Sequence, residues 1–131
     1  MATAGPNFPA TGADDASTGT RVWTNTGNIF AKDGSYASTT AVVSFAVGSH
    51  YLKATNFGFS IPSGATINGI TAVFTRCGSG VPCQDTGVKI VKGGTITGTD
   101  QKSGTYWSSA GTMRDDTYGG ATNLWGTTWT D

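Results

Sequence analysis

The chain has 131 residues, of which 37% are apolar and only 12% are charged, and its 8 basic and 8 acidic residues give a formal net charge of zero. The lack of a polybasic run argues against nucleic acid as a partner, and the lack of an apolar run of roughly 20 residues argues against a membrane-spanning helix. The 4 Trp, 4 Tyr and 6 Phe residues supply large side chains, so we expect one folded domain, not a disordered chain.

The first twenty residues are rich in Gly, Pro, Thr, Ala and Asp and hold almost no large side chain. Such a segment cannot offset its loss of conformational entropy by burial within its own fold. We therefore predict an extended arm over residues 1–20 that becomes ordered against a partner, with Asn7 and Phe8 as contact residues. The segment has neither a basic start nor an apolar stretch, so we predict no signal peptide; the protein is then made in the cytoplasm, or exported by a route that the sequence does not show.

From residue 21 onward, short runs of β-branched and aromatic residues alternate with turn-forming residues. The predicted strands cover residues 21–25, 41–47, 50–59, 66–76, 86–92 and 95–99. Asp33 with Gly34 signals a hairpin turn, Gly93 with Gly94 turns the chain again, and residues 61–64 have the composition of a type I turn. Residues 100–120 are predicted to be loop.

No segment carries apolar residues at helical spacing over three turns, so little helix is expected. In the clearest strand, Ile70, Ala72 and Phe74 alternate with Thr and Val and are predicted to face inward. Many short strands separated by turns at intervals of about ten residues are typical of sandwiches and barrels. We predict an all-β protein in which residues 21–131 form a single β-sandwich of jelly-roll type.

The four tryptophans have two alternative roles, since they could fill the core or stack on sugar rings. Because the chain has few Leu and Ile residues, we predict that Trp23 and Trp125 belong to the core. Trp107 and Trp129 lie in loop-like or terminal contexts, and we predict that they are exposed contact residues. A glycan is thus an alternative partner.

Two cysteines, Cys77 and Cys83, enclose a loop of five residues. Zinc needs four ligands, and the chain's one histidine, His50, is far away in the sequence. A disulfide at a hairpin tip and a pair of free thiols both remain open.

The sequence offers few candidate catalytic residues, because the chain contains no Glu and lacks the G-x-S-x-G motif. The single histidine is predicted to lie at the surface or on an edge strand, and the aspartates to serve turns and solubility. Asp33, Asp115 and Asp116 are weak candidates for Ca²⁺ ligands, without the regular spacing of a calcium loop. We predict no catalytic residue, no bound cofactor, no metal and no enzymatic activity.

Four blocks of the sequence carry a resemblance to a known family. They are VWTNTGNIFAKDGSYAS, YLKATNFGFSIPSGATINGI, VKIVKGGTITGTDQKSGTYW and YGGATNLWGTTWT. Together they resemble a module of bacteriophage-encoded virion proteins over about residues 22–130. The resemblance implies a β-sandwich and a virion-associated role, and it brings no catalytic residues with it.

The chain departs from the family pattern in two places. Thr26 follows Trp23, Thr24 and Asn25 where relatives often have Pro, and relatives usually continue past the WGTTWT block into another apolar strand. A missing closing strand would leave an open sheet edge, which a neighbouring chain could fill by strand addition.

These expectations combine into a virion structural protein, most concretely a capsid decoration (cement) protein on the virion surface. It would bind the major capsid protein or other virion proteins, with a homotrimer as the favoured oligomer. One alternative is a carbohydrate- or receptor-binding module of a phage fibre or tail. A second alternative is a subunit of a fibre or filament joined by strand addition.

Overall fold

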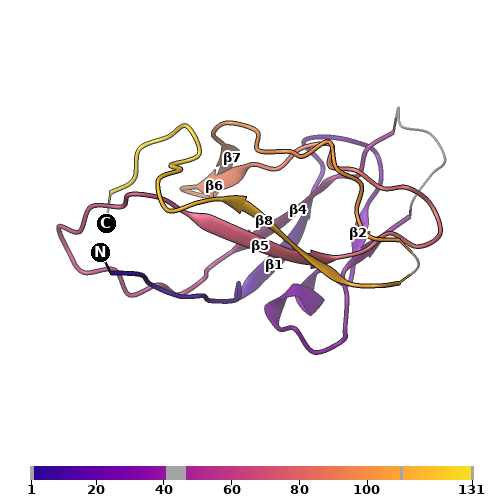
Figure 1. Ribbon diagram of the computed structural model, residues 1–131, viewed down its shortest axis with the longest axis horizontal. Coiled ribbons are helices and arrows are strands. Elements are labelled where there is room, and N and C mark those ends of the chain that lie inside the picture. Colours follow the sequence, from indigo (N-terminus) through magenta and orange to yellow (C-terminus); the bar gives the residue numbers. More distant parts are fainter. Residues whose placement is uncertain (1, 41–46, 110, 131) are drawn as a thin grey trace. The chain divides into compact units, whose positions relative to one another are not determined.

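The computed structural model describes residues 2–40, 47–109 and 111–130 (Figure 1). Within these residues the chain is all-β, as predicted: eight short strands form four antiparallel sheets of two strands each, and none of these sheets closes into a barrel. The only helical element in this part of the chain is a five-residue 3-10 helix. No helix among these residues is long and apolar enough to cross a membrane. The strand predicted at 41–47 lies almost entirely outside the described residues.

The chain divides into two compact units near residue 65. The N-terminal unit contains described residues 2–40 and 47–65, and the C-terminal unit contains described residues 66–109 and 111–130. Inside each unit the first strand pairs with the last strand and the two middle strands pair with each other. The sequence predicted a boundary at residue 20 instead, between an arm and a single domain.

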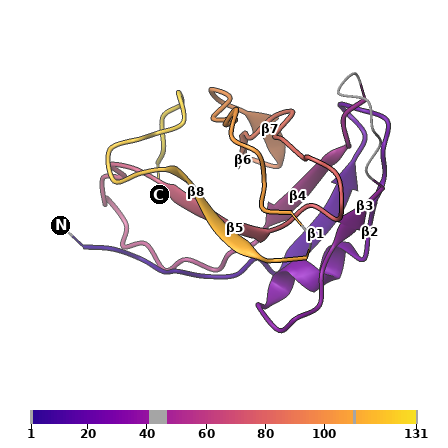
Figure 2. The same ribbon diagram turned by 45° about the vertical axis from the view of Figure 1, so that its right-hand side comes forward.

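The N-terminal unit is built around β1 (Thr11–Asp15), which pairs antiparallel with β4 (Tyr51–Thr55) (Figure 2). β2 (Trp23–Thr24) pairs with β3 (Ser38–Thr39), and between them the 3-10 helix η1 (Thr26–Phe30) packs beside β1. The chain bends at the predicted position, Asp33 and Gly34, but this bend lies in the long connection that also contains η1 and is not a short hairpin turn. The carboxylate of Asp33 accepts the N–H of Ser35 at 2.9 Å, and Gly34 has φ = 89°.

Much of the expected arm lies along its own chain. The side-chain amide of Asn7 donates to the Phe57 carbonyl at 2.8 Å, and the N–H of Ala10 lies 3.2 Å from the Thr55 carbonyl oxygen, just before β1 begins. Main-chain pairing with β4 therefore stabilises this segment despite its lack of large side chains. The prediction based on burial alone left out this contribution.

The C-terminal unit pairs β5 (Thr71–Arg76) antiparallel with β8 (Arg114–Gly119) (Figure 1). β6 (Ile90–Lys92) and β7 (Thr95–Thr97) form a hairpin. The glycines of the hairpin turn, at positions 93 and 94, have φ values of 56° and 80°, as the predicted turn requires. The prediction of loop throughout 100–120 is wrong, because β8 lies within that range.

The core of the described residues is small. Val88, Tyr118 and Trp125 are its buried hydrophobic residues, with Ile70, Ala72 and Ile90 packed against them. Trp125 is 1% exposed, which confirms its predicted place in the core, whereas Trp23 is only half-buried and is not among the core residues. Phe74, predicted to face inward, is 40% exposed and touches the core through an edge contact with Tyr118, with ring centres 5.5 Å apart.

The turn predicted over residues 61–64 is shifted by one residue. The N–H of Ala65 donates to the Pro62 carbonyl at 3.1 Å, which makes Pro62 the first residue of the turn. Gly64 is then at the third position with φ = 77°, the conformation that a type II turn needs and a type I turn does not.

Gly119, at the end of β8, provides a test of how tightly the core packs. It has φ = 74°, and a Cβ atom there would collide with the Ile70 carbonyl oxygen and lie 2.7 Å from Nε1 of Trp125. Gly119→Ala should lower the free energy of unfolding by about 2–4 kcal/mol, through overpacking and backbone strain together. Urea denaturation followed by Trp fluorescence measures the change.

Gly80 is the matched control, because it has φ = 77° and a Cβ atom added there would have no neighbouring atom within 4 Å. Gly80→Ala should cost only about 1 kcal/mol, since it adds the backbone strain without the collision. Equal losses in the two variants would show that the core around Trp125 is not packed as described.

Candidate functional site

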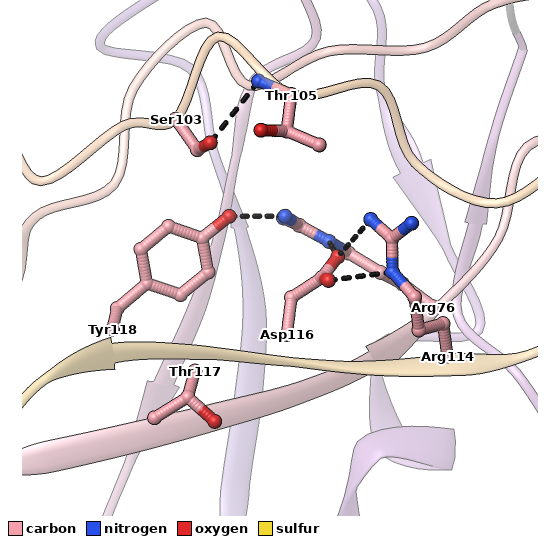
Figure 3. Close-up of a pocket in the computed structure, with 7 residues that line it drawn as sticks. All are labelled: Arg76, Ser103, Thr105, Arg114, Asp116, Thr117 and Tyr118. Atoms are coloured by element: carbon pink, nitrogen blue, oxygen red, sulfur yellow. Dashed lines mark hydrogen bonds and ion pairs between the residues drawn. The ribbon is translucent and has the colours of Figure 1, made fainter.

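The C-terminal unit holds a cluster of charged and aromatic side chains centred on Arg76 (Figure 3). The register of β5 and β8 places Ala72 opposite Tyr118, Phe74 opposite Asp116 and Arg76 opposite Arg114. Because alternate residues of a strand share a face, the side chains at these positions lie on one face of the two-stranded sheet. This face carries both the core residue Tyr118 and the charged cluster.

The guanidinium group of Arg76 donates to three different side chains. Its Nε lies 2.9 Å from Oδ2 of Asp116, its Nη1 lies 2.7 Å from Oδ1 of Asp85, and its Nη2 donates to the hydroxyl of Tyr118. The guanidinium carbon also lies 4.4 Å from the centre of the Trp107 ring, a cation–π contact. Every nitrogen of this arginine therefore has a partner within the unit.

Asp85 is the buried anion of the cluster, with a side chain only 1% exposed. Besides Arg76, three groups donate to its carboxylate: Nε1 of Trp107 at 2.9 Å, the hydroxyl of Tyr118 at 2.5 Å and the N–H of Ser103 at 3.0 Å. A buried carboxylate is costly unless its lone pairs are satisfied, and these donors satisfy them. Asp85 thus joins residues 103–107 to β5 and β8.

The same contacts shift the pKa values of the cluster. Burial raises the pKa of Asp85, but the hydrogen bonds and the charge of Arg76 outweigh it, so the pKa lies below its usual 3.8. The pKa of Asp116 is also lowered, chiefly by the hydrogen bond from Arg114. Burial, together with the bond to Asp85, raises the pKa of Tyr118 to about 12.

A pocket of about 190 Å³ opens beside the cluster. Its lining residues are Arg76, Ser103, Thr105, Arg114, Asp116, Thr117 and Tyr118 (Figure 3). Arg114 bridges to Asp116, with Nε 2.7 Å from Oδ1 and Nη2 3.2 Å from Oδ2, and Nη2 also donates to the Tyr106 carbonyl at 3.0 Å. The pocket therefore combines paired charges with hydroxyl groups.

The N-terminal unit contains a second polar pair, which joins Asp14 in β1 to His50. Nδ1 of His50 lies 2.7 Å from Oδ2 of Asp14, while Oδ1 of Asp14 accepts the N–H of Trp23 at 2.7 Å. These bonds lower the pKa of Asp14, the backbone bond most strongly. The side chain of His50 is only 13% exposed, and the residue directly precedes β4, which pairs with a single described strand, so it lies beside an edge strand, one of its two predicted places. The indole of Trp23 donates to the His50 carbonyl at 2.8 Å, so hydrogen bonds connect all three residues within this unit.

The structure does not bring the candidate calcium ligands together. Asp115 and Asp116 are consecutive in β8 and point to opposite faces: Asp115 accepts the hydroxyl of Thr75 at 2.5 Å, whereas Asp116 binds the two arginines. Asp33 caps its own turn. In the described part of the chain no group of three His, Cys, Asp or Glu residues could hold a metal ion.

The predicted contact residues have different surroundings. Phe8 is 58% exposed, but Trp107 and Trp129 are half-buried. The indole N–H of Trp129 donates to the Leu124 carbonyl at 3.0 Å, and that of Trp107 to Asp85. Neither indole is an open platform on which a sugar ring could stack. Asn7 uses its side-chain amide within the chain, on the Phe57 carbonyl.

Cys77 and Cys83 are both half-buried, and they are not joined in a disulfide. Burial raises the pKa of the Cys83 thiol, and the neighbouring Cys77 raises it further. A raised pKa keeps the thiol protonated and lowers its reactivity.

No protein-family model, no curated protein and no solved structure matches this chain. The Arg76 cluster was not predicted from the sequence, although one signal pointed to it. Arg76 lies on the same predicted strand face as Ile70, Ala72 and Phe74, because alternate residues share a face. The predicted inward face therefore already included an arginine, and a buried arginine needs an acidic partner.

The lowered pKa values predict that acid weakens the fold. A carboxylate whose pKa is lower in the folded state stabilises the protein above its unfolded pKa, and this contribution is lost as the pH falls through the folded value. The free energy of unfolding, from urea titrations, should be highest near neutral pH and fall from about pH 5 downward. Asp116→Asn should flatten this dependence, because it removes one of the titrating groups.

Asp33→Asn is the control, since that side chain caps an exposed turn that Asn also supports. It should leave the pH dependence unchanged. A wild-type stability that stays constant between pH 7 and pH 3 would contradict the described bonding of the carboxylates.

Proposed function

We propose that this chain is a non-catalytic virion structural protein, and specifically a capsid decoration protein that binds the outer shell. The observation that carries the proposal is the pairing of its strands. Each of the eight described strands belongs to a sheet of only two strands, so each has one edge that no other described strand pairs with. Unpaired edges present rows of N–H and C=O groups that accept a strand from another chain.

Exposed aromatic side chains support the same proposal. Phe8, Tyr36, Phe59 and Tyr106 are between 46% and 58% exposed. Aromatic residues are enriched in protein–protein interfaces, where charged residues are depleted. A zero net charge lets identical copies approach without repulsion, which suits the homotrimer that we propose.

The bonding of the charged residues supports a role without catalysis. A general base or nucleophile needs a group that is held in reach of a substrate. Arg76 and Asp85 instead form hydrogen bonds with each other and with Tyr118, Trp107 and Ser103. This bonding suits a cluster that holds the unit together.

We also propose that the strands form a β-sandwich of jelly-roll type. In each unit the fourth strand returns to pair with the first, β4 with β1 and β8 with β5. Such long-range antiparallel pairs are a feature of Greek-key folds, the class to which jelly rolls belong.

A decoration protein would act on the shell through mass action. Binding the major capsid protein on adjacent subunits favours the assembled lattice over free subunits, because the bound protein adds interface area that only the assembly offers. A filament subunit joined by strand addition is the second candidate, because it uses the same unpaired edges.

Immunogold electron microscopy tests the proposal. Antibodies against the chain should label particles purified from the culture that produces it, and the label should cover icosahedral shells because decoration sites repeat with the lattice. Label confined to long filaments would contradict capsid decoration and support a filament subunit joined by strand addition. Label on tail tips or fibres alone, or on no particle at all, would contradict capsid decoration.

A further inference from the structure

We propose that the pocket beside Arg76 binds a single neutral sugar ring. This inference goes beyond the proposed virion role and does not depend on it. Ser103 and Thr105 lie on one side of the pocket, and Asp116 with the two arginines lies on the other (Figure 3). Hydroxyl groups and paired charges thus surround the same space.

The charge balance of the pocket selects a neutral ligand. The two guanidinium groups of Arg76 and Arg114 are offset by the two carboxylates of Asp85 and Asp116, through ion pairs of 2.7–2.9 Å. An anion would have to compete with carboxylates already bound to the arginines, and a cation would meet carboxylates already neutralised. Neither kind of ion gains a net electrostatic attraction there.

The polarity of the pocket selects a ligand that both donates and accepts hydrogen bonds. An apolar ligand would desolvate Asp116, Arg114 and the Thr105 hydroxyl without replacing their bonds to water, which is unfavourable. A diol offers donors and acceptors together. Arg114 uses Nε and Nη2 in its bonds to the described residues, and Nη1 remains to donate to a ligand hydroxyl while Oδ1 of Asp116 accepts from the next one.

The size of the pocket suits a single ring. Its volume of about 190 Å³ is below the roughly 300–1,000 Å³ of pockets that hold drug-sized ligands. Tyr106 lies beside Thr105 and is 49% exposed, so an aromatic residue neighbours the pocket. A monosaccharide meets all three requirements: it is neutral, it carries adjacent hydroxyls, and it is a single ring.

Saturation-transfer NMR on the full chain tests this site with glucose, galactose and N-acetylglucosamine at millimolar concentration. At least one of them should receive saturation, and Arg114→Met should weaken its binding by about tenfold or more, because a bond from a charged donor is lost. Arg114 is 42% exposed, so its ion pair contributes only modestly to stability and the variant should stay folded, which a thermal melt checks. Thr105→Val is a second variant, with a smaller change in shape and the same expected direction.

Lys102→Met is the matched control, since it removes a positive charge from an exposed residue outside the pocket lining. It should leave binding unchanged. Tighter binding of a branched glycan than of its terminal monosaccharide would identify the ring as a glycan end, and equal binding would identify a free sugar; both support the site. No saturation of any neutral sugar, tighter binding of glucuronate or glucosamine, or loss of binding in Lys102→Met alone would overturn the proposal.

Discussion

The bond between Arg76 and Asp85 is the interaction on which the C-terminal unit depends. Asp85 is almost completely buried, and a buried carboxylate without a counter-charge would cost several kcal/mol. Arg76 supplies that charge and also reaches Asp116 and Tyr118. One guanidinium group therefore connects β5, β8 and the chain around Asp85, and Trp107 packs on it.

This arrangement follows from a composition with few large aliphatic residues. Only Val88, Tyr118 and Trp125 form the buried hydrophobic core of the described residues, so hydrophobic burial alone contributes little. Hydrogen bonds and ion pairs supply fixed geometry in its place, in the C-terminal unit through Arg76 and in the N-terminal unit through Asp14 and His50. The sheets remain two strands wide, and their unpaired edges are what we propose other subunits use.

Local chemistry was predictable from the sequence, and pairing between distant residues was not. The turns at Asp33 and at Gly93 follow from residue types that favour those conformations in any fold. β8 was missed because its Arg and Asp residues have low strand propensity, and it is stabilised by β5 and by Arg76, 40 residues before Asp116. β1 was missed for a similar reason, since its partner β4 is distant in the sequence.

A double-mutant cycle tests directly whether Arg76 and Asp85 act as one unit. Arg76→Met and Asp85→Asn should each lower the free energy of unfolding by about 3–5 kcal/mol, because each leaves a buried partner without its counter-charge. The loss of unfolding free energy in the double variant should be smaller than the sum of the two single losses, by about 2 kcal/mol or more. The second change removes a partner that is already unpaired, so it costs less than it would alone. Losses that add to within about 0.5 kcal/mol would contradict the coupling.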